Sequence, residues 1–197
     1  IFVDGKADPH VWMDVALWEV GVQLVVDKLS KNDPENRPLF EENGALLSEK
    51  LQQADADIFS QMQSIPEKNR FLVSSHDAFN YFVRHYFSNS QSCWSKRCCA
   101  PNGLAPDAQL SLMDIHNVLD YLVEHQINTI FPESSVSPDA LHKLAEASHK
   151  KGLPLTICRS YLYSDSMKKG TSYIEMIRHN ANTIHQALTC DSYGTNN

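Results

Sequence analysis

The chain has 197 residues, of which 42% are hydrophobic and 21% charged, an ordinary globular composition that excludes a fibre or a disordered tail. Its 17 Lys and Arg against 24 Asp and Glu give a net charge of −7, which disfavours a nucleic-acid partner and mildly attracts cations. The sequence contains no apolar run of about 18 residues, so no membrane-spanning helix is predicted. The chain opens on Ile1 rather than Met, and we expect upstream residues to precede it.

The first third of the chain is predicted to form two helices. Asp8-Pro9 is typical of a helix start, with an Asp cap followed by Pro in the first turn. Apolar residues follow at helical spacing until residues 32–34, Asn-Asp-Pro, break the pattern. A longer helix with one apolar stripe is predicted over residues 35–62. A helix of this length fits either a rigid connector between two lobes or an ordinary surface helix.

Short apolar runs alternate with helical patterns over residues 67–190. The alternation implies parallel strands joined by right-handed helical crossovers, and therefore one α/β lobe with an open sheet. Strands are predicted at 71–74, 127–131 and 155–163, helices at 79–86, 111–126, 137–152 and 171–188, and irregular structure at 88–106.

A residue able to bind a metal follows each of the three predicted strands. His76 follows the first strand, Glu133 the second and Asp165 the third. Ligands bind at the carboxyl ends of the strands in an open parallel sheet, because the connecting loops converge there. A neutral imidazole with carboxylates suits Zn²⁺, Mn²⁺ or Fe, so the sequence predicts a transition-metal site at this edge.

Each of these residues also has a purely structural interpretation. His76 fits a satisfied polar residue after a strand, Glu133 fits a partner for the N-terminus of the next helix, and Asp165 fits a Ser-Asp-Ser turn. The same set would also suit a metallohydrolase that keeps a water on its zinc. The sequence has no His-Glu-x-x-His motif and no evident nucleophile–base pair, which disfavours a hydrolase.

Five motifs in order carry a family resemblance: DPHVW at 8–12, SHDAFNYF at 75–82, FPESSV at 131–136, YSDSM at 163–167 and MIRHN at 176–180. With these motifs the chain resembles the metal-binding proteins of zinc, manganese and iron ABC importers over essentially its whole length. Treponemal and chlamydial members are the expected look-alikes. The resemblance implies a two-lobed, periplasmic-binding-protein-like α/β fold joined by one long helix, with the metal between the lobes.

The same resemblance implies three parts in this chain. Residues 1–34 match a remnant of the amino-terminal lobe, 35–66 the long linking helix, and 67–197 the carboxy-terminal α/β metal-binding lobe. Most of the amino-terminal lobe, with one further histidine ligand, is expected upstream of residue 1.

The family pattern places the metal on His10, His76 and Asp165. Glu133, Asp77 and Ser164 are expected to contact these ligands or their loops and to hold them in place. Two features depart from the pattern: Pro132 stands where a β-branched residue is common, and the loop at 168–171 is shorter than usual.

The implied function is extracytoplasmic capture of one Zn, Mn or Fe ion and its delivery to an ABC permease in a bacterial membrane. We expect a monomer on the periplasmic or extracellular face, with a lipid anchor as one option, no nucleic-acid partner and no enzymatic activity. A surface adhesion or interaction protein with a structural metal is the alternative, and a metallohydrolase is less favoured.

The five cysteines leave several pairings open. An extracytoplasmic setting permits disulfides, and Cys158 with Cys190 is the candidate pair across the back of the lobe. Cys93, Cys98 and Cys99 lie in the irregular stretch, where one further pair or a zinc knuckle are the alternatives. No second Cys-x-x-Cys and no nearby His completes a knuckle.

Overall fold

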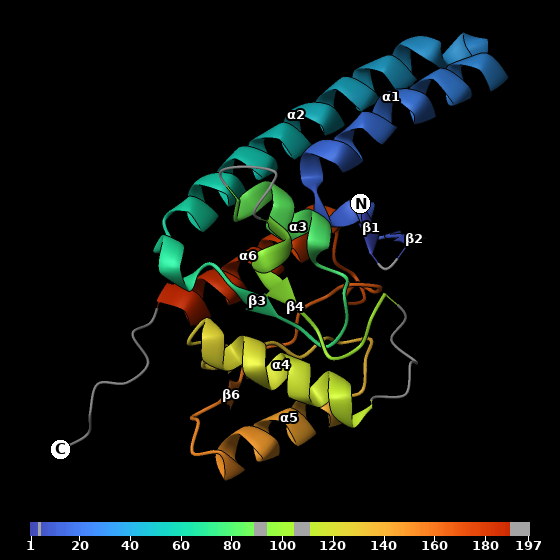
Figure 1. The fold of residues 1–197 in the computed structure, drawn as a ribbon. Helices are drawn as coiled ribbons and strands as arrows, with labels where there is room; N and C mark the ends of the chain where they lie inside the picture. The colour runs from blue at the N-terminus through green and yellow to red at the C-terminus, as the bar shows by residue number, and fades with distance from the viewer. Residues whose placement is uncertain (4, 89–93, 105–110, 190–197) are drawn as a thin grey trace.

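The computed structural model describes residues 1–3, 5–88, 94–104 and 111–189. Two long helices form a hairpin that projects from an α/β body (Figure 1). Helix α1 spans Val15–Asn32 and helix α2 spans Arg37–Gln63, with a short 3-10 turn at Pro34–Asn36 between them. The two helices lie side by side, so the long helix predicted from the sequence is observed with a partner along one flank.

Helix α1 begins later than the sequence predicts. Asp14 is its N-cap, and the Asp14 carboxylate accepts a hydrogen bond from the backbone N of Leu17 at 3.0 Å. The prediction that Asp8-Pro9 starts this helix is wrong. The Asp8 carboxylate binds His10 instead, and a 3-10 turn at Val11–Met13 separates this segment from α1.

Helix α2 is a continuous helix of 27 residues, which at about 1.5 Å per residue is roughly 40 Å long. Its buried residues in the second half recur every three or four positions and face the core of the body: Leu51, Ala54, Ile58 and Met62. In the first half, Gly44 is buried where α2 meets Val26 of α1. The helix is therefore held by the hairpin at one end and by the body at the other.

Four short parallel strands form the centre of the body: β3 Leu72–Val73, β4 Cys98–Cys99, β5 Thr129–Ile130 and β6 Thr156–Ile157. Strand β3 pairs with β4 and β5 pairs with β6, and a parallel bridge between Ser74 and Phe131 connects the two pairs. The order is therefore β4–β3–β5–β6.

Strand β4 lies in the stretch predicted to be irregular, and the predicted strands at 127–131 and 155–163 are longer than those observed. Strands β1 Phe2–Val3 and β2 Lys6–Ala7 form a separate antiparallel hairpin.

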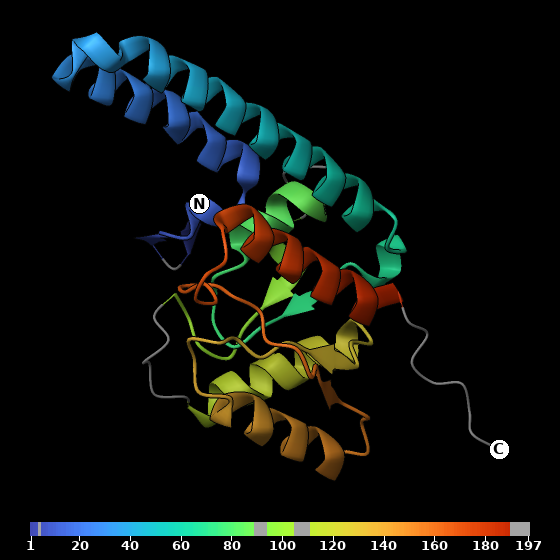
Figure 2. The same ribbon diagram turned by 180° about the vertical axis from the view of Figure 1, so that it is seen from behind.

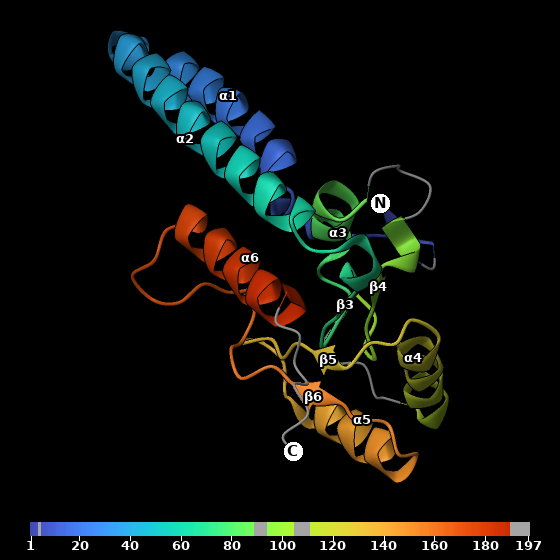
Figure 3. The same ribbon diagram turned by 90° about the vertical axis from the view of Figure 1, so that its left-hand side faces the viewer.

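Helices cover both faces of this sheet (Figures 2 and 3). Leu72 packs in a core cluster with residues of α2, α3 and α6, whereas its neighbour Val73 packs in a second cluster with residues of α4 and α5. This alternation of side chains along β3 is what a strand requires, and it makes the body a three-layer helix–sheet–helix structure. The remaining elements are α3 Asn80–Tyr86, α4 Leu112–Glu124, α5 Asp139–Lys150 and α6 Tyr173–Thr189, with 3-10 turns at Glu67–Asn69 and Trp94–Lys96.

Two residues mark helix ends in the body, near the bounds predicted at 111 and 152. Ser111 caps α4 and forms a reciprocal capping box with Asp114. Gly152 follows α5 with a φ of +74°, a left-handed conformation that favours glycine at a helix end. Within the described part of the chain, no helix combines the length and apolarity needed to cross a bilayer.

The hairpin depends on the absence of a side chain at Gly44. A Cβ built at Gly44 overlaps a methyl group of the buried Val26, whereas nothing lies within 4 Å of a Cβ built at Gly21 of α1. We expect Gly44→Ala to lower the free energy of unfolding by about 1–2 kcal/mol, because overpacking outweighs the gain in helix propensity. Gly21→Ala is the matched control and should raise it by up to about 1 kcal/mol. Urea unfolding of both variants checks this, and a Gly44→Ala protein as stable as Gly21→Ala would contradict it.

A half-buried polar cluster joins the hairpin to the body. His85 Nε2 of α3 lies 3.0 Å from Asp55 Oδ1 of α2, and the Tyr86 hydroxyl donates to the same oxygen at 2.7 Å. His85 Nδ1 also lies 3.9 Å from Asp14 Oδ2, and Arg84 Nη2 lies 3.7 Å from that oxygen. Burial lowers the pKa of His85, but the hydrogen bond to Asp55 and the charges of Asp14 and Asp55 outweigh it, so the pKa is raised overall.

This cluster predicts a pH-dependent contribution to stability. A raised His85 pKa in the folded state stabilises the protein fully below the unfolded value of about 6.5, and this stabilisation is lost as the pH rises through the folded pKa. The difference in unfolding free energy between the wild type and His85→Gln should therefore be larger near about pH 5.5 than near about pH 9. Urea unfolding at both pH values measures this difference, in which titrating groups that do not interact with His85 cancel, while Asp55, whose pKa is already lowered, is ionised at both pH values. The same difference at both pH values would show that His85 titrates normally.

Candidate metal centre

His10 is held by the carboxylate of Asp8, two residues before it. Asp8 Oδ1 accepts a hydrogen bond from the His10 backbone N at 2.9 Å and lies 2.7 Å from His10 Nδ1. Burial raises the pKa of Asp8, but its hydrogen bonds, chiefly those with His10, outweigh burial and lower it overall. An ionised Asp8 accepts a hydrogen bond from Nδ1–H, which leaves the lone pair of a neutral imidazole on Nε2.

His76 is contacted at its backbone N and its ring by Glu133, which follows the neighbouring strand β5. Glu133 Oε1 accepts from the His76 backbone N at 2.8 Å, and Oε2 lies 2.7 Å from His76 Nδ1, although this second contact is poorly aligned as a hydrogen bond. Burial lowers the pKa of His76, but Glu133 and then Asp165 outweigh it and raise the pKa overall. His76 Nε2 is buried without a hydrogen-bond partner among the described residues, as expected of an atom whose lone pair is available to a metal ion.

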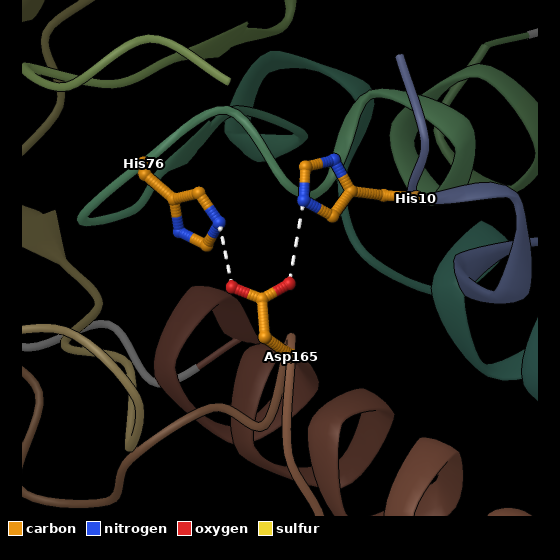
Figure 4. Close-up of side chains that lie close together, drawn as sticks. All are labelled: His10, His76 and Asp165. Atoms are coloured by element: carbon orange, nitrogen blue, oxygen red, sulfur yellow. Dashed lines mark ion pairs between the residues drawn. The ribbon is translucent and has the colours of Figure 1, made fainter. Parts of the chain in front are cut away.

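Asp165 follows strand β6 and places its carboxylate between the two imidazoles (Figure 4). Its Oδ1 lies 3.4 Å from His10 Nε2 and its Oδ2 lies 3.2 Å from His76 Nε2. The two rings have centroids 5.3 Å apart and planes inclined by 77°. Both histidines are buried, whereas the Asp165 side chain is 33% exposed, so one side of the group faces solvent.

The spacing of these three side chains fits a single ion. Their ligand atoms all lie within 4.8 Å of one another, and in the described part of the chain no other group of three His, Cys, Asp or Glu residues does so. Ligands at about 2.0–2.1 Å from a tetrahedral ion are about 3.3 Å apart, close to the nitrogen–oxygen distances observed here. Two imidazole nitrogens and one carboxylate are a donor set for Zn, Mn or Fe.

Two of the residues expected to support the ligands, Glu133 and Ser164, contact the segments that carry the candidate ligands. Glu133 contacts His76 directly, and the Ser164 carbonyl accepts from Trp12 Nε1 at 2.9 Å, which ties the Asp165 loop to the His10 segment. Asp77 contributes to the raised pKa of His76 through its charge. Sequence reasoning missed Asp8 as the partner of His10, and the only available signal was its position two residues earlier in the chain.

The described residues include only three of the five cysteines, so they do not test the predicted pairings. Cys98, Cys99 and Cys158, the cysteines among the described residues, form no disulfide with one another. Cys93 and Cys190 lie outside the described residues, so the pairing of Cys158 with Cys190 stays a prediction. The zinc-knuckle alternative includes Cys93, so it is not tested by the described residues either.

Comparison with known proteins agrees with this geometry. Residues 3–187 match the model of the periplasmic zinc-uptake complex component A, and the chain belongs to this family. It is 38% identical over 190 residues to the manganese-binding lipoprotein MntA of Bacillus subtilis, which covers 94% of this chain and 59% of that protein. The chain spans 57–59% of the length of such curated relatives.

Two solved structures show the same fold. Fe(III)-bound YtgA from Chlamydia trachomatis superposes with a TM-score of 0.90 at 32% identity, over 96% of this chain and 66% of that one. The periplasmic zinc-binding protein TroA from Treponema pallidum gives 0.86 at 30% identity, over 95% and 66%. The resemblance to chlamydial and treponemal metal-binding proteins and the binding-protein-like α/β fold are therefore confirmed. The three names mention manganese, iron and zinc, so the family does not define one metal.

The contact between Glu133 and His76 makes a prediction about ligand orientation. Glu133→Gln keeps an acceptor for the His76 backbone N but removes the negative charge beside Nδ1. We expect metal affinity to fall by about 10- to 100-fold, the usual cost of losing such a supporting partner. Chelator competition with the full-length protein measures this, and Glu146→Gln on the exposed face of α5 is the control. Wild-type affinity in Glu133→Gln would show that the carboxylate does not orient His76 for binding.

Proposed function

We propose that this chain is the metal-binding part of an extracytoplasmic solute-binding protein that captures a Zn, Mn or Fe ion and delivers it to an ABC permease. The observation that carries the proposal is the convergence of His10 Nε2, His76 Nε2 and the Asp165 carboxylate, from three distant parts of the chain. The family description, a component of a zinc-uptake complex, supports transport rather than catalysis.

The site is suited to capture and release. Reversible uptake needs strong ligands whose arrangement can change, and here the ligands come from separate segments. His10 precedes the helical hairpin, whereas His76 and Asp165 belong to the α/β body. We propose that residues 1–34 belong to one lobe, 35–66 to the linking helix and 67–197 to the other lobe. A small rocking of the lobes about α2 would then withdraw His10 and weaken coordination.

The setting proposed for the protein is the periplasmic or extracellular face of a bacterial membrane. Names of similar proteins include "periplasmic" for TroA and "lipoprotein" for MntA, which support such a setting and a lipid anchor as one mode of attachment. A monomeric binding protein that docks on a permease fits this arrangement. Laminin-binding proteins of similar structure are only 19–20% identical, and that similarity shows the fold alone, so it does not favour an adhesive function.

Metal analysis of the purified full-length protein tests the proposal. We expect His76→Ala and Asp165→Ala each to lose the stoichiometric ion, because each removes one of the converging ligands. His116→Ala and Asp120→Ala are matched controls, since these residues form an exposed His–Asp pair on α4 at 3.6 Å, and both should keep the metal. Circular dichroism confirms that all four variants are folded. A full complement of metal in both site variants would refute the proposed site.

A further inference from the structure

Asn80, the first residue of α3, lies buried between the two segments that carry the histidines. Its side-chain amide makes hydrogen bonds in three directions. Nδ2 donates to Asp8 Oδ2 at 3.0 Å and to the Asp77 carbonyl at 3.1 Å, and Oδ1 accepts from the Cys98 thiol at 3.3 Å. Asn80 is only 5% exposed, so these bonds are sheltered from water.

The chemistry of these partners fixes the orientation of the amide. A carboxylate and a carbonyl both require a donor, so they must face the NH₂ group of Asn80. Burial raises the pKa of the Cys98 thiol, which therefore remains a neutral S–H donor toward Oδ1. Turning the amide around would place Oδ1 against the Asp8 carboxylate and the Asp77 carbonyl, neither of which can donate, so these two partners hold Asn80 in one orientation.

Two of these three partners are directly connected to the proposed ligands, one by hydrogen bonds and one by the backbone. Asp8 holds both the backbone and the Nδ1 of His10, and Asp77 directly follows His76. The third partner, Cys98, is on strand β4, which pairs with the strand that precedes His76. One amide thus joins the His10 segment, the His76 loop and the sheet.

We propose that Asn80 is a positioning residue that sets the distance and angle between the two imidazoles before the metal arrives. This inference rests on the proposed function and deepens it, because it names the device that preorganises the site. Without the amide, Asp8 loses one of its donors, and the His10 segment loses its side-chain link to the His76 loop. The imidazoles would then sample a wider range of separations, and each ion bound would have to order them.

The test is the affinity of the full-length protein for Zn²⁺, measured by chelator competition, in Asn80→Ala. We expect a loss of about 10- to 100-fold, the range typical of residues that orient metal ligands. Asn69→Ala is the matched control, because the Asn69 amide also joins two distant segments, by donating to the Leu188 carbonyl at 3.1 Å, but none of the proposed ligands lies in them. The control should bind Zn²⁺ within about twofold of the wild type.

A double-mutant cycle separates positioning from a general structural effect. If Asn80 acts through Asp8, then adding Asn80→Ala to Asp8→Asn should weaken Zn²⁺ binding much less than Asn80→Ala does alone. The visible absorption of the Co²⁺-loaded protein should also change in Asn80→Ala and stay unchanged in Asn69→Ala. Cys98→Ala removes only the bond to Oδ1, so it gives a milder variant, with a smaller loss of affinity, should Asn80→Ala not fold.

The outcomes distinguish this inference from the proposed function. Unchanged Zn²⁺ affinity and an unchanged Co²⁺ spectrum in both Asn80→Ala and Cys98→Ala would overturn the role of Asn80, and so would strictly additive losses in the cycle. Equal Zn²⁺ binding by the wild type and His76→Ala would instead overturn the site itself. A loss confined to Asn80→Ala and its coupled partner supports the inference.

Discussion

The pairing of each histidine with a buried carboxylate is the constraint on which the site depends. Asp8 and Glu133 each contact the backbone N and the ring Nδ1 of their histidine, so a single carboxylate fixes both the position of the loop and the rotation of the ring. Burying two carboxylates is costly, and the short contacts to N–H groups offset that cost. Both Nε2 atoms are consequently turned toward Asp165, where an ion can be shared.

The sheet brings these pairs together because its strands are parallel. His76 and Glu133 leave neighbouring strands β3 and β5 at the same edge, and the bridge between Ser74 and Phe131 keeps the two strands in register up to that edge. Strand β3 is only two residues long, yet Leu72 and Val73 are each fully buried in a different core cluster. The cores on the two faces, rather than an extended ladder of hydrogen bonds, therefore fix where the loops begin.

Much of this arrangement could be predicted from the sequence, and the exceptions have physical reasons. The convergence of His76, Glu133 and Asp165 follows from strand order, and α2 follows from its apolar stripe. Asp8 was mistaken for a helix cap, because an Asp before Pro has the same local pattern whether it accepts from a helix or from His10. Strand β4 was missed because two residues show no periodicity. Its place is determined by pairing with β3.

The three residues of the candidate metal centre are unequally buried. The two imidazoles are almost completely enclosed, whereas a third of the Asp165 side chain is exposed. Within this chain, the Asp165 carboxylate is therefore the most accessible of the three groups. The Asp165 carboxylate faces both imidazoles at once, and the hydrogen bond from Trp12 to Ser164 links its loop to the His10 segment. Under the proposed function, a movement that separates these two segments would displace His10 and Asp165 from each other, and so weaken the hold of both candidate ligands on an ion.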